Sequence, residues 1–542
     1  MSKTVKQKVL VVSDSTGRGL GGVPVFNWEL TKGLAKHYDV TLFTVMPHQG
    51  KEKTQGKTLE ELYDEAKVEI SEQHGGVKVA LVRNNANIEN KYLKGLLWGA
   101  VESGKPEDYG LPSAGDNVFD VTIGHSRFSG PAAVRIGELW YPDTKKVWFL
   151  HTLPEEYDAI KGTPQEGIEH ALLEAHWMPR ADIVTGVGPV MTEEALILSR
   201  RLGLPKVPSV HDFTPGTELS DPVTPEEHDF FEVLLMGRAD DKIKGADDAI
   251  RAIRLANAEA GDKKFRLKIR GVPSPEVKLT QDWANDIAGN DYSVVILAFT
   301  KDGNELINDI RSADTGIMDS HVEGFGLVFT EFSSHGIPAL ANERSGAAGF
   351  VLDPQRVPQE IGADCVVLDR GFAGIRPQLW KDALLKQRDH ISERFEAARE
   401  LRETFSRYSW ENGAKVLVEV ALATDPSVPK YTIQGPDGTV TEREISEIDS
   451  PPEDRIPLSS DSEMLDFTEL TVARDLGDEK RATITQIEEQ LKKSGNPEER
   501  EELQKRINET TKEWEERKVE ENRDRENEME NDGEELGELG EK

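Results

Sequence analysis

Short apolar runs, each followed by a turn and then by an amphipathic stretch, recur through most of the chain up to residue 424. Short apolar runs bounded by turns are typical of buried strands, and apolar residues three and four apart are typical of helices. Strands are predicted in this way at residues 9–13, 39–45, 77–82, 119–125, 147–152, 265–270, 292–297, 313–318 and 339–342. Strands that alternate with helices predict α/β units.

The first of these units carries a glycine-rich turn. The strand at 9–13 is followed by Gly17-x-Gly19-x-Gly21-Gly22, a helix pattern and the strand at 39–45. A dinucleotide-binding fold requires Gly-x-Gly-x-x-Gly directly after the first strand and an acidic residue at the end of the second. The glycine spacing differs here and residues 44–46 contain no acid, so we do not expect NAD as a cofactor.

The chain length and a proline-rich stretch predict more than one domain. A chain of 542 residues exceeds what one hydrophobic core usually holds. Residues 204–215 are rich in proline and poor in strand patterns, so we interpret them as an interdomain hinge, and a second α/β unit begins at residue 231. Helices are predicted at 246–258, 304–312 and 380–405, with a last apolar helix up to 422. We predict an α/β protein with Rossmann-like domains at 1–210 and 211–424.

The remaining residues, 425–542, form a predicted acidic tail. This segment contains 36 acidic and 17 basic residues and so carries −19 of the net charge of −34. Excess negative charge argues against nucleic acid as a partner, because sequence-independent binding needs basic residues. We expect disorder over 425–478, whose composition is polar. Apolar residues at helical spacing near 484–491 and 503–514 predict either a solvated helical tail or a hairpin for a protein partner or self-association.

Cysteine content and hydropathy bear on the compartment. The single cysteine, Cys365, excludes an internal disulfide and a cysteine-rich zinc site, and we interpret it as a core residue. No run of eighteen apolar residues predicts a transmembrane segment, and the first apolar run is too short for a signal peptide. We therefore expect a reducing, cytoplasmic location.

A longer motif lies between the strand at 313–318 and a helix predicted at 327–335. It contains Glu323-Gly324-Phe325-Gly326, and Glu331 follows eight residues after Glu323. A turn that begins a helix presents free backbone N–H groups and the positive end of the helix dipole, which attract an anion such as a diphosphate. Glu331, about one turn into the helix, is placed to reach a sugar hydroxyl group of a bound nucleotide.

This motif resembles the Glu-x7-Glu signature of retaining GT-B glycosyltransferases of family 4, including Glu-Gly-Phe-Gly-Leu-Val and a closing Gly-x-Pro. The resemblance covers about residues 7–424 and implies two Rossmann-like domains that face a cleft. The family usually has Pro-Ser where this chain has Asp319-Ser320, and alanine where it has Phe332. It also usually has serine at Gly188 and glycine at Ala347.

The resemblance implies a role for each site residue. Arg238 and Lys244 would neutralise the leaving diphosphate; the spacing leaves Lys242 as an alternative to Lys244, although the glycine after Lys244 favours that lysine. Glu323 would contact the donor sugar, and His151 would lie beside the reacting carbon. His125 is a second histidine candidate at a strand end. The expected donor-binding residues are Gly21, Gly22, Gly324, Phe325, Gly326, Leu327 and Glu331.

The implied reaction transfers a hexose from a nucleotide-diphosphate sugar to an acceptor hydroxyl group with retention of configuration. No metal is needed when cationic side chains stabilise the diphosphate, and no Asp-x-Asp motif is present in the expected place. Nucleotide sugar is a co-substrate, so we expect no separate cofactor. Two alternatives stay open: a catalytically weakened scaffold protein that uses its tail, and a sugar epimerase that lacks an acceptor.

Overall fold

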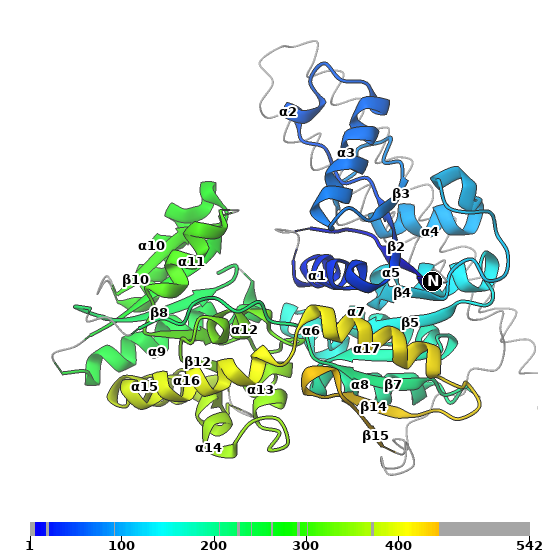
Figure 1. Cartoon of the computed structure of the whole chain (residues 1–542). Helices are drawn as coiled ribbons and strands as arrows, with labels where there is room; N and C mark the ends of the chain where they lie inside the picture. The colour runs from blue at the N-terminus through cyan, green and yellow to red at the C-terminus, as the bar shows by residue number, and fades with distance from the viewer. Residues whose placement is uncertain are drawn as a thin grey trace, which may run out of the picture. The chain divides into compact units, whose positions relative to one another are not determined.

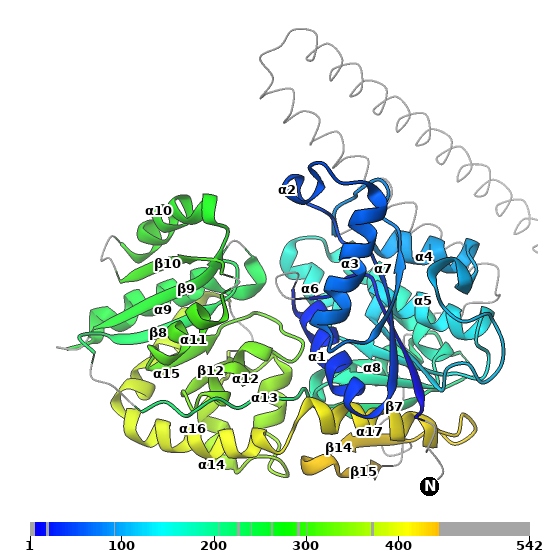
Figure 2. The same ribbon diagram turned by 45° about the horizontal axis from the view of Figure 1, so that its top comes forward.

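The computed structural model describes residues 6–443, except residues 18–20, 91–92, 205, 225–227, 240, 262–263, 290–292, 301 and 370–372. These described residues all belong to one unit of the chain, Met1–Leu458. The predicted helical segments near 484–491 and 503–514 lie outside the described residues. Figure 1 and Figure 2 show helices and strands arranged around two sheets.

Nine strands form the first sheet in the described part of the chain, in the order β15-β14-β7-β6-β5-β4-β1-β2-β3. Neighbouring strands are parallel, except for the antiparallel pair β14–β15. The strands are β1 (Lys8–Ser13), β2 (Asp39–Val45), β3 (Lys78–Val82), β4 (Val121–His125), β5 (Lys145–Leu150), β6 (Ile183–Val187), β7 (Ser209–Phe213), β14 (Tyr431–Gln434) and β15 (Val440–Arg443). We refer to this sheet and its helices as the first domain.

The second sheet, which defines the second domain, is parallel throughout its six described strands, in the order β10-β9-β8-β11-β12-β13. They are β8 (Phe231–Met236), β9 (Phe265–Val272), β10 (Val294–Ala298), β11 (Thr315–Met318), β12 (Ala339–Asn342) and β13 (Val366–Val367). The second α/β unit therefore begins at residue 231, as predicted from the sequence. Both sheets confirm the α/β class.

Helices connect the strands. They are α1 (Gly22–His37), α2 (Lys51–Thr54), α3 (Leu59–Gln73), α4 (Leu93–Ser103), α5 (Ser126–Leu139), α6 (Pro154–Lys161), α7 (Pro164–Trp177), α8 (Pro189–Arg201), α9 (Ala246–Glu259), α10 (Val277–Ala288), α11 (Gly303–Arg311), α12 (Leu327–Ser334), α13 (Gly346–Val351), α14 (Gln359–Gly362), α15 (Arg376–Asp389), α16 (Ile391–Ser406) and α17 (Trp410–Ala423). Within the described residues, no helix combines the length and apolar character needed to cross a bilayer.

Apolar residues on both faces of each sheet explain why these strands read as continuous apolar runs. In β1, Val9 and Val11 belong to one core cluster, whereas Leu10 and Val12 belong to another. All four side chains are fully buried. A parallel strand covered on both faces has this pattern, since successive side chains point to opposite sides.

Two sequence-based predictions were wrong about where the first sheet ends. The stretch 204–215 is not strand-poor, because it contains β7. The segment from residue 425 is not wholly disordered: β14 pairs with β7, and β15 pairs with β14. Thr432 and Gln434 of β14 are buried, whereas all four β15 residues are exposed. Each of these strands has only four residues, too few for a clear alternating pattern, and β14 pairs with a strand that is distant in the sequence.

The predicted helix at 380–405 is also two helices. It is interrupted at His390, whose φ of −122° and ψ of 32° are not helical, and it divides into α15 and α16. The last helix, α17, lies against α1 of the first domain, as both views show (Figures 1 and 2). A Cβ on Gly33 of α1 would overlap the carbonyl oxygen of Trp410, so glycine permits this close contact between the helices.

Candidate active site

A glycine-rich turn connects β11 to α12 and holds the motif that begins at Glu323. Gly326 caps α12 with a φ of +93°, a conformation that favours glycine. A Cβ on Gly324 would overlap the carbonyl oxygen of His151, so this turn lies directly against the chain that leaves β5. The N–H groups of the first turn of α12 therefore begin beside the first domain, and such groups favour an anionic ligand.

Lys244 and Glu323 form an ion pair at this turn. The distance from Nζ to Oε2 is 2.6 Å, and the two side chains are 28% and 22% exposed. Ser320 donates a hydrogen bond from Oγ to the same carboxylate oxygen at 3.2 Å, and the N–H of Glu323 donates to the carbonyl of Arg344 at 3.0 Å. Burial alone would lower the pKa of Lys244, but the charge of Glu323 and its hydrogen bond raise that pKa above its usual value. Lys244 is therefore cationic at neutral pH.

The 3₁₀ helix η4 (Lys242–Lys244) determines which of two lysines meets the motif. Lys242 is exposed, whereas Lys244 contacts Glu323. Gly245 follows with a φ of +67°, and a Cβ at this position would overlap the carbonyl oxygen of Asp319. The close contact between η4 and the end of β11 thus favours Lys244 over Lys242 as the site residue.

The side chain of Arg238 is more exposed than that of Lys244. Its side chain is 64% exposed, and its Nη2 donates a hydrogen bond to Asp241 at 3.3 Å, a geometry in which an ion pair is weak. Tyr157 lies on α6, which contacts η4. Burial and then the charge of Asp241 raise the pKa of Tyr157, whereas Lys244 and Arg238 both act to lower it.

Sequence reasoning missed Tyr157. Its only local signal is its position six residues after His151, in a helix that contacts η4. The neighbouring Glu156 accepts a hydrogen bond from Nε of Arg344 at 3.1 Å. The side of α6 that carries these residues therefore lies against two loops of the second domain.

His151 directly follows β5 and is 9% exposed. Its Nε2 is 3.0 Å from Nδ1 of His125, and Nε2 of His125 is 3.0 Å from Oδ1 of Asn27. Burial lowers the pKa of His125 to about 3, and burial together with His125 lowers the pKa of His151 well below its usual value. The structure therefore brings the two predicted histidines together as neutral rings.

The predicted glycine pair of the first domain lies at the start of α1. Gly21 is the N-cap, with a φ of +110°. No described atom lies within 4 Å of a Cβ built on Gly21 or Gly22. Among the described residues, no atom therefore blocks either glycine, and their role in binding the donor stays a prediction.

Three further predicted donor-binding residues lie in the turn before α12 or in that helix. Leu327 is half-buried and Glu331 is exposed. The ring of Phe325 is 3% exposed and meets Phe350 edge-on, with the ring centres 6.2 Å apart. Only the backbone of Phe325 is thus placed to contact a ligand.

Two of the departures from the usual family residues, Gly188 and Asp319, have a specific partner in the fold. Gly188 has a φ of +82°, and a Cβ there would meet the ring of Phe325 at 2.5 Å. Asp319 is fully buried and pairs with Arg376, while burial raises the pKa of Asp319 well above its usual range. Ala347 is fully buried and its N–H donates to the carbonyl of Phe325 at 2.8 Å. These residues fit this fold as they stand.

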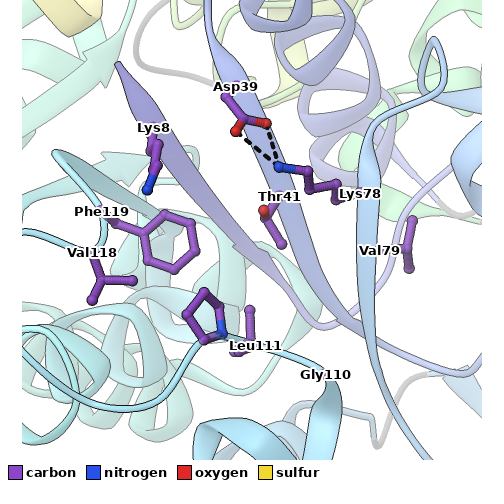
Figure 3. A pocket seen from close by; sticks show the side chains of 10 residues that line it. Lys8, Asp39, Thr41, Lys78, Val79, Gly110, Leu111, Val118 and Phe119 are labelled. Atoms are coloured by element: carbon purple, nitrogen blue, oxygen red, sulfur yellow. Dashed lines mark hydrogen bonds and ion pairs between the residues drawn. The ribbon is translucent and has the colours of Figure 1, made fainter. Parts of the chain in front are cut away.

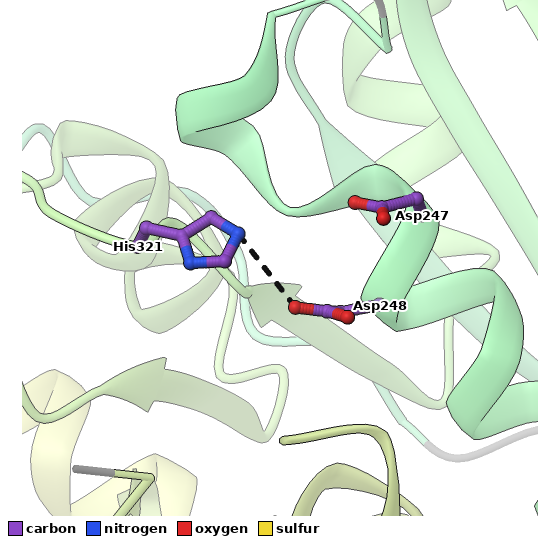
Figure 4. Close-up of side chains that lie close together, drawn as sticks. All are labelled: Asp247, Asp248 and His321. Atoms are coloured by element: carbon purple, nitrogen blue, oxygen red, sulfur yellow. Dashed lines mark ion pairs between the residues drawn. The ribbon is translucent and has the colours of Figure 1, made fainter. Parts of the chain in front are cut away.

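One group with the spacing of metal ligands occurs in the described part of the chain, formed by Asp247, Asp248 and His321 (Figure 4). Nε2 of His321 is 3.6 Å from Asp248. Arg376 donates to the same carboxylate at 2.9 Å, and Arg251 lies 3.0 Å from Asp247. Because guanidinium groups already neutralise both carboxylates, we assign no ion to this group.

A pocket of about 390 Å³ lies at the amino ends of strands β1, β2 and β3 of the first sheet (Figure 3). Lys8, Asp39 and Lys78 line it, and each is the first residue of its strand. Nζ of Lys78 is 2.8 Å from Asp39. In parallel α/β sheets ligands usually bind outside the carboxyl ends of the strands, where Gly21 and His151 lie. This pocket is therefore separate from the candidate active site.

Comparisons with known proteins agree with this geometry. Residues 10–417 match the family model described as "GT4-conflict: Family 4 Glycosyltransferase in conflict systems". The D-inositol 3-phosphate glycosyltransferase of Corynebacterium urealyticum is 27% identical over 342 residues, which cover 59% of this chain and 74% of that protein. The glycogen synthase of Mycobacterium tuberculosis is 30% identical over 196 residues, which cover 35% of this chain and 42% of the relative.

Solved structures share the fold. The sucrose-phosphate synthase from Thermosynechococcus elongatus superposes with a TM-score of 0.55 at 17% identity, covering 77% of this chain and 98% of that one. The Candida albicans trehalose-6-phosphate phosphatase N-terminal domain gives 0.54 at 13% identity, covering 78% and 97%. The two parallel-sheet domains thus have the GT-B architecture. The chain belongs to the family 4 glycosyltransferases, enzymes that transfer a sugar from a nucleotide-sugar donor.

Proposed function

We propose that the protein transfers a hexose from a nucleotide-diphosphate sugar to a hydroxyl group of an acceptor, with retention of configuration at the anomeric carbon. The observation that carries this proposal is the meeting of Lys244, Glu323 and the turn at Gly324 against the carbonyl of His151. A cation and a helix N-terminus suit a diphosphate. A carboxylate and a neutral imidazole beside them suit the hydroxyl groups of a sugar.

The chemistry follows from where charge develops. The bond between the anomeric carbon and the diphosphate oxygen breaks, and a bond to the acceptor oxygen forms on the same face of the sugar. The proton of the acceptor hydroxyl group is transferred to an oxygen of the leaving diphosphate, so atoms and charge balance. Lys244 and the N–H groups of α12 stabilise the negative charge that builds on the diphosphate, and Arg238 turns inward from its exposed position to join them. Preorganised electrostatic groups of this kind usually make the largest catalytic contribution.

Other residues hold the donor and exclude water. Glu323 binds hydroxyl groups of the transferred sugar once Lys244 has moved to the diphosphate, and Glu331 holds the ribose of the nucleotide. Contacts across the cleft, such as Glu156 with Arg344, support a closed state of the two domains. Closure would keep water from the donor and so limit hydrolysis.

The acceptor is proposed only as a hydroxyl compound. The relatives differ in this respect, since one is a D-inositol 3-phosphate glycosyltransferase and another is a glycogen synthase. Acceptor groups would enter beside His151, where the first domain contributes the turn at Gly21.

Packing at the altered positions argues against a scaffold without turnover. Such a protein would be expected to lose charged site residues, whereas Lys244 and Glu323 are paired. The altered residues Gly188 and Asp319 each have a partner in this fold, and Ala347 is fully buried. Substitution at those positions is therefore explained by packing and is not a sign of a decayed site.

A panel of nucleotide sugars tests the proposal. UDP-glucose, UDP-galactose, GDP-mannose and ADP-glucose are each incubated with the full chain, with and without simple sugar and polyol acceptors, and release of nucleotide is measured. Thermal shift reports binding, and NMR of the anomeric proton of the product reports retention. Binding without release supports the scaffold. Release of nucleotide together with a free, altered sugar supports the epimerase.

A further inference from the structure

Three buried polar side chains from three elements form one hydrogen-bonded chain that ends at His151. Oδ1 of Asn27, on α1, is 3.0 Å from Nε2 of His125, at the end of β4. Nδ1 of His125 is 3.0 Å from Nε2 of His151, after β5. Asn27 and His125 are fully buried, whereas His151 is 9% exposed. The chain therefore runs from the core of the first domain to the candidate site.

The protons in this chain are coupled. A neutral imidazole carries one N–H, so one ring nitrogen donates and the other accepts. With the amide oxygen of Asn27 facing His125, His125 must hold its proton on Nε2, and its Nδ1 must accept from Nε2–H of His151. Nδ1 of His151 then carries a lone pair. If Asn27 could not accept, both rings would be free to change tautomer together, and Nδ1 of His151 would carry the proton.

The surroundings keep both rings neutral and in place. Phe149 stacks on His125 with ring centres 5.5 Å apart, and Phe26 meets His151 edge-on at 4.8 Å. Burial is the cause that lowers the pKa of His125. The N–H of His151 donates to Oγ of Ser126 at 3.0 Å, which holds the backbone beside the ring.

We propose that Asn27 and His125 are positioning residues that fix the tautomer of His151, so that its Nδ1 accepts a hydrogen bond from a hydroxyl group of the donor sugar. This inference rests on the proposed function of His151 beside the reacting carbon. A neutral ring suits that place. Positive charge builds on the anomeric carbon as the bond to the diphosphate breaks, and an imidazolium group would oppose it.

Two substitutions of Asn27 should change the tautomer of His151 in different ways. In Asn27→Asp, the carboxylate raises the pKa of His125, because an opposite charge favours the protonated ring. Below that pKa both nitrogens of His125 donate, so His151 accepts at Nε2 and holds its proton on Nδ1; above it the wild-type tautomer returns. In Asn27→Leu, His125 has no acceptor at Nε2 and donates from Nδ1, so the tautomer of His151 is reversed at every pH.

The tautomers are read by ¹⁵N NMR of ring nitrogens in the full chain labelled at histidine, from pH 5.5 to 9. The signal of His151 is assigned with His151→Gln. We expect a neutral His151 protonated on Nε2 in the wild type, a pH-dependent reversal in Asn27→Asp and a constant reversal in Asn27→Leu. Thr31→Val is the matched control, since Thr31 lies one turn further along α1 and is also buried. It leaves the tautomer unchanged.

Kinetics with the active member of the nucleotide-sugar panel then test the role in turnover. We expect kcat of Asn27→Leu to fall about tenfold with KM nearly constant, the scale of one misdirected hydrogen bond. Asn27→Asp should recover activity as pH rises. Wild-type His151 protonated on Nδ1, or both variants with the wild-type tautomer, overturns the proposal, and the wild-type spectrum decides even if a variant does not fold. The expected tautomers without any turnover would instead count against the proposed function.

Discussion

The ammonium group of Lys244 lies 2.6 Å from Oε2 of Glu323, although 79 positions separate the two residues in the sequence. The contact joins η4, which follows β8, to the turn that follows β11, and these strands are neighbours in the second sheet. In the proposed reaction the same two groups serve different parts of the donor. Arrival of a diphosphate would draw Lys244 away and leave the carboxylate of Glu323 to bind the sugar.

Lys244→Ala should lower kcat/KM about 100-fold, because one preorganised charge is lost at the departing diphosphate. Nucleotide release from the active donor measures the effect. The matched control is Lys242→Ala, which removes an exposed lysine from the same short helix. We expect that variant to stay within about twofold of the wild type, since a substitution of an exposed side chain away from the site usually has little effect.

The opposite ranking of the two lysine variants would assign the diphosphate to Lys242. Wild-type turnover in both would remove η4 from the mechanism. Thermal unfolding of each variant separates lost catalysis from lost folding, because Lys244→Ala also leaves Glu323 without its ion-pair partner.

Arg238→Ala should also lower turnover about 100-fold, but without a change in stability. Its side chain is 64% exposed and its pair with Asp241 is weak, so the free energy of unfolding should change by less than about 0.5 kcal/mol. Arg251→Ala is a suitable control, since Arg251 is a half-exposed arginine that pairs with an aspartate three or four residues away on α9. Equal turnover in wild type and Arg238→Ala would show that this guanidinium never reaches the donor.

Local patterns were enough for most of the fold. The strands predicted at 39–45 and 339–342 have the bounds of β2 and β12, because an apolar run between turns is a local signal. The strand at Val440–Arg443 was missed because its four residues are all exposed and therefore show no apolar pattern. The break at His390 was missed because the residues around it keep a helical composition.

The candidate site depended more on tertiary structure. The sequence left Lys242 and Lys244 as alternatives, and the packing of η4 against β11 distinguished them. Asn27 had no local signal, and the only signal for Tyr157 was its position six residues after His151. A polar residue on a helix is usually exposed, and only the fold shows that Asn27 faces a buried histidine.

Gly188→Ser, which restores the usual family residue, should destabilise the protein. The φ of +82° and ψ of 175° at Gly188 lie in a region that is nearly restricted to glycine, where another residue costs about 1–3 kcal/mol. The new Cβ would also meet the ring of Phe325. Thermal or urea unfolding of wild type and variant measures the loss.

A glycine without these constraints serves as the control for that variant. Gly99 lies within α4, and nothing described lies within 4 Å of a Cβ built there. Gly99→Ala should therefore raise stability by about 0.5–1 kcal/mol, since alanine is the better helix former. If Gly188→Ser were as stable as the wild type, the backbone at the start of α8 would have to adopt another conformation in solution.

Glu174 should make stability depend on pH. It is fully buried on α7, accepts hydrogen bonds from the N–H of Arg127 at 2.8 Å and from Nε1 of Trp148 at 3.0 Å, and has its pKa raised by burial from 4.5 to about 7. A raised pKa means that the folded protein binds this proton more tightly than the unfolded chain. The resulting stabilisation is fully present below pH 4.5 and is lost as pH rises through about 7.

Comparison with Glu174→Gln isolates this contribution. The free energy of unfolding of wild type minus that of the variant should decrease by roughly 2–3 kcal/mol between pH 4.5 and 8, at about 1.4 kcal/mol for each pKa unit. Urea unfolding across that range measures the slope, and any constant cost of the glutamine amide drops out of it. Trp148→Phe removes a hydrogen bond that lowers the pKa of Glu174, so the pKa of Glu174 should be higher in that variant. The free energy of unfolding of Trp148→Phe should therefore continue to decrease up to a higher pH than that of the wild type. A difference that stays flat with pH would contradict this prediction, because it would mean that Glu174 has the same pKa in the folded and in the unfolded chain.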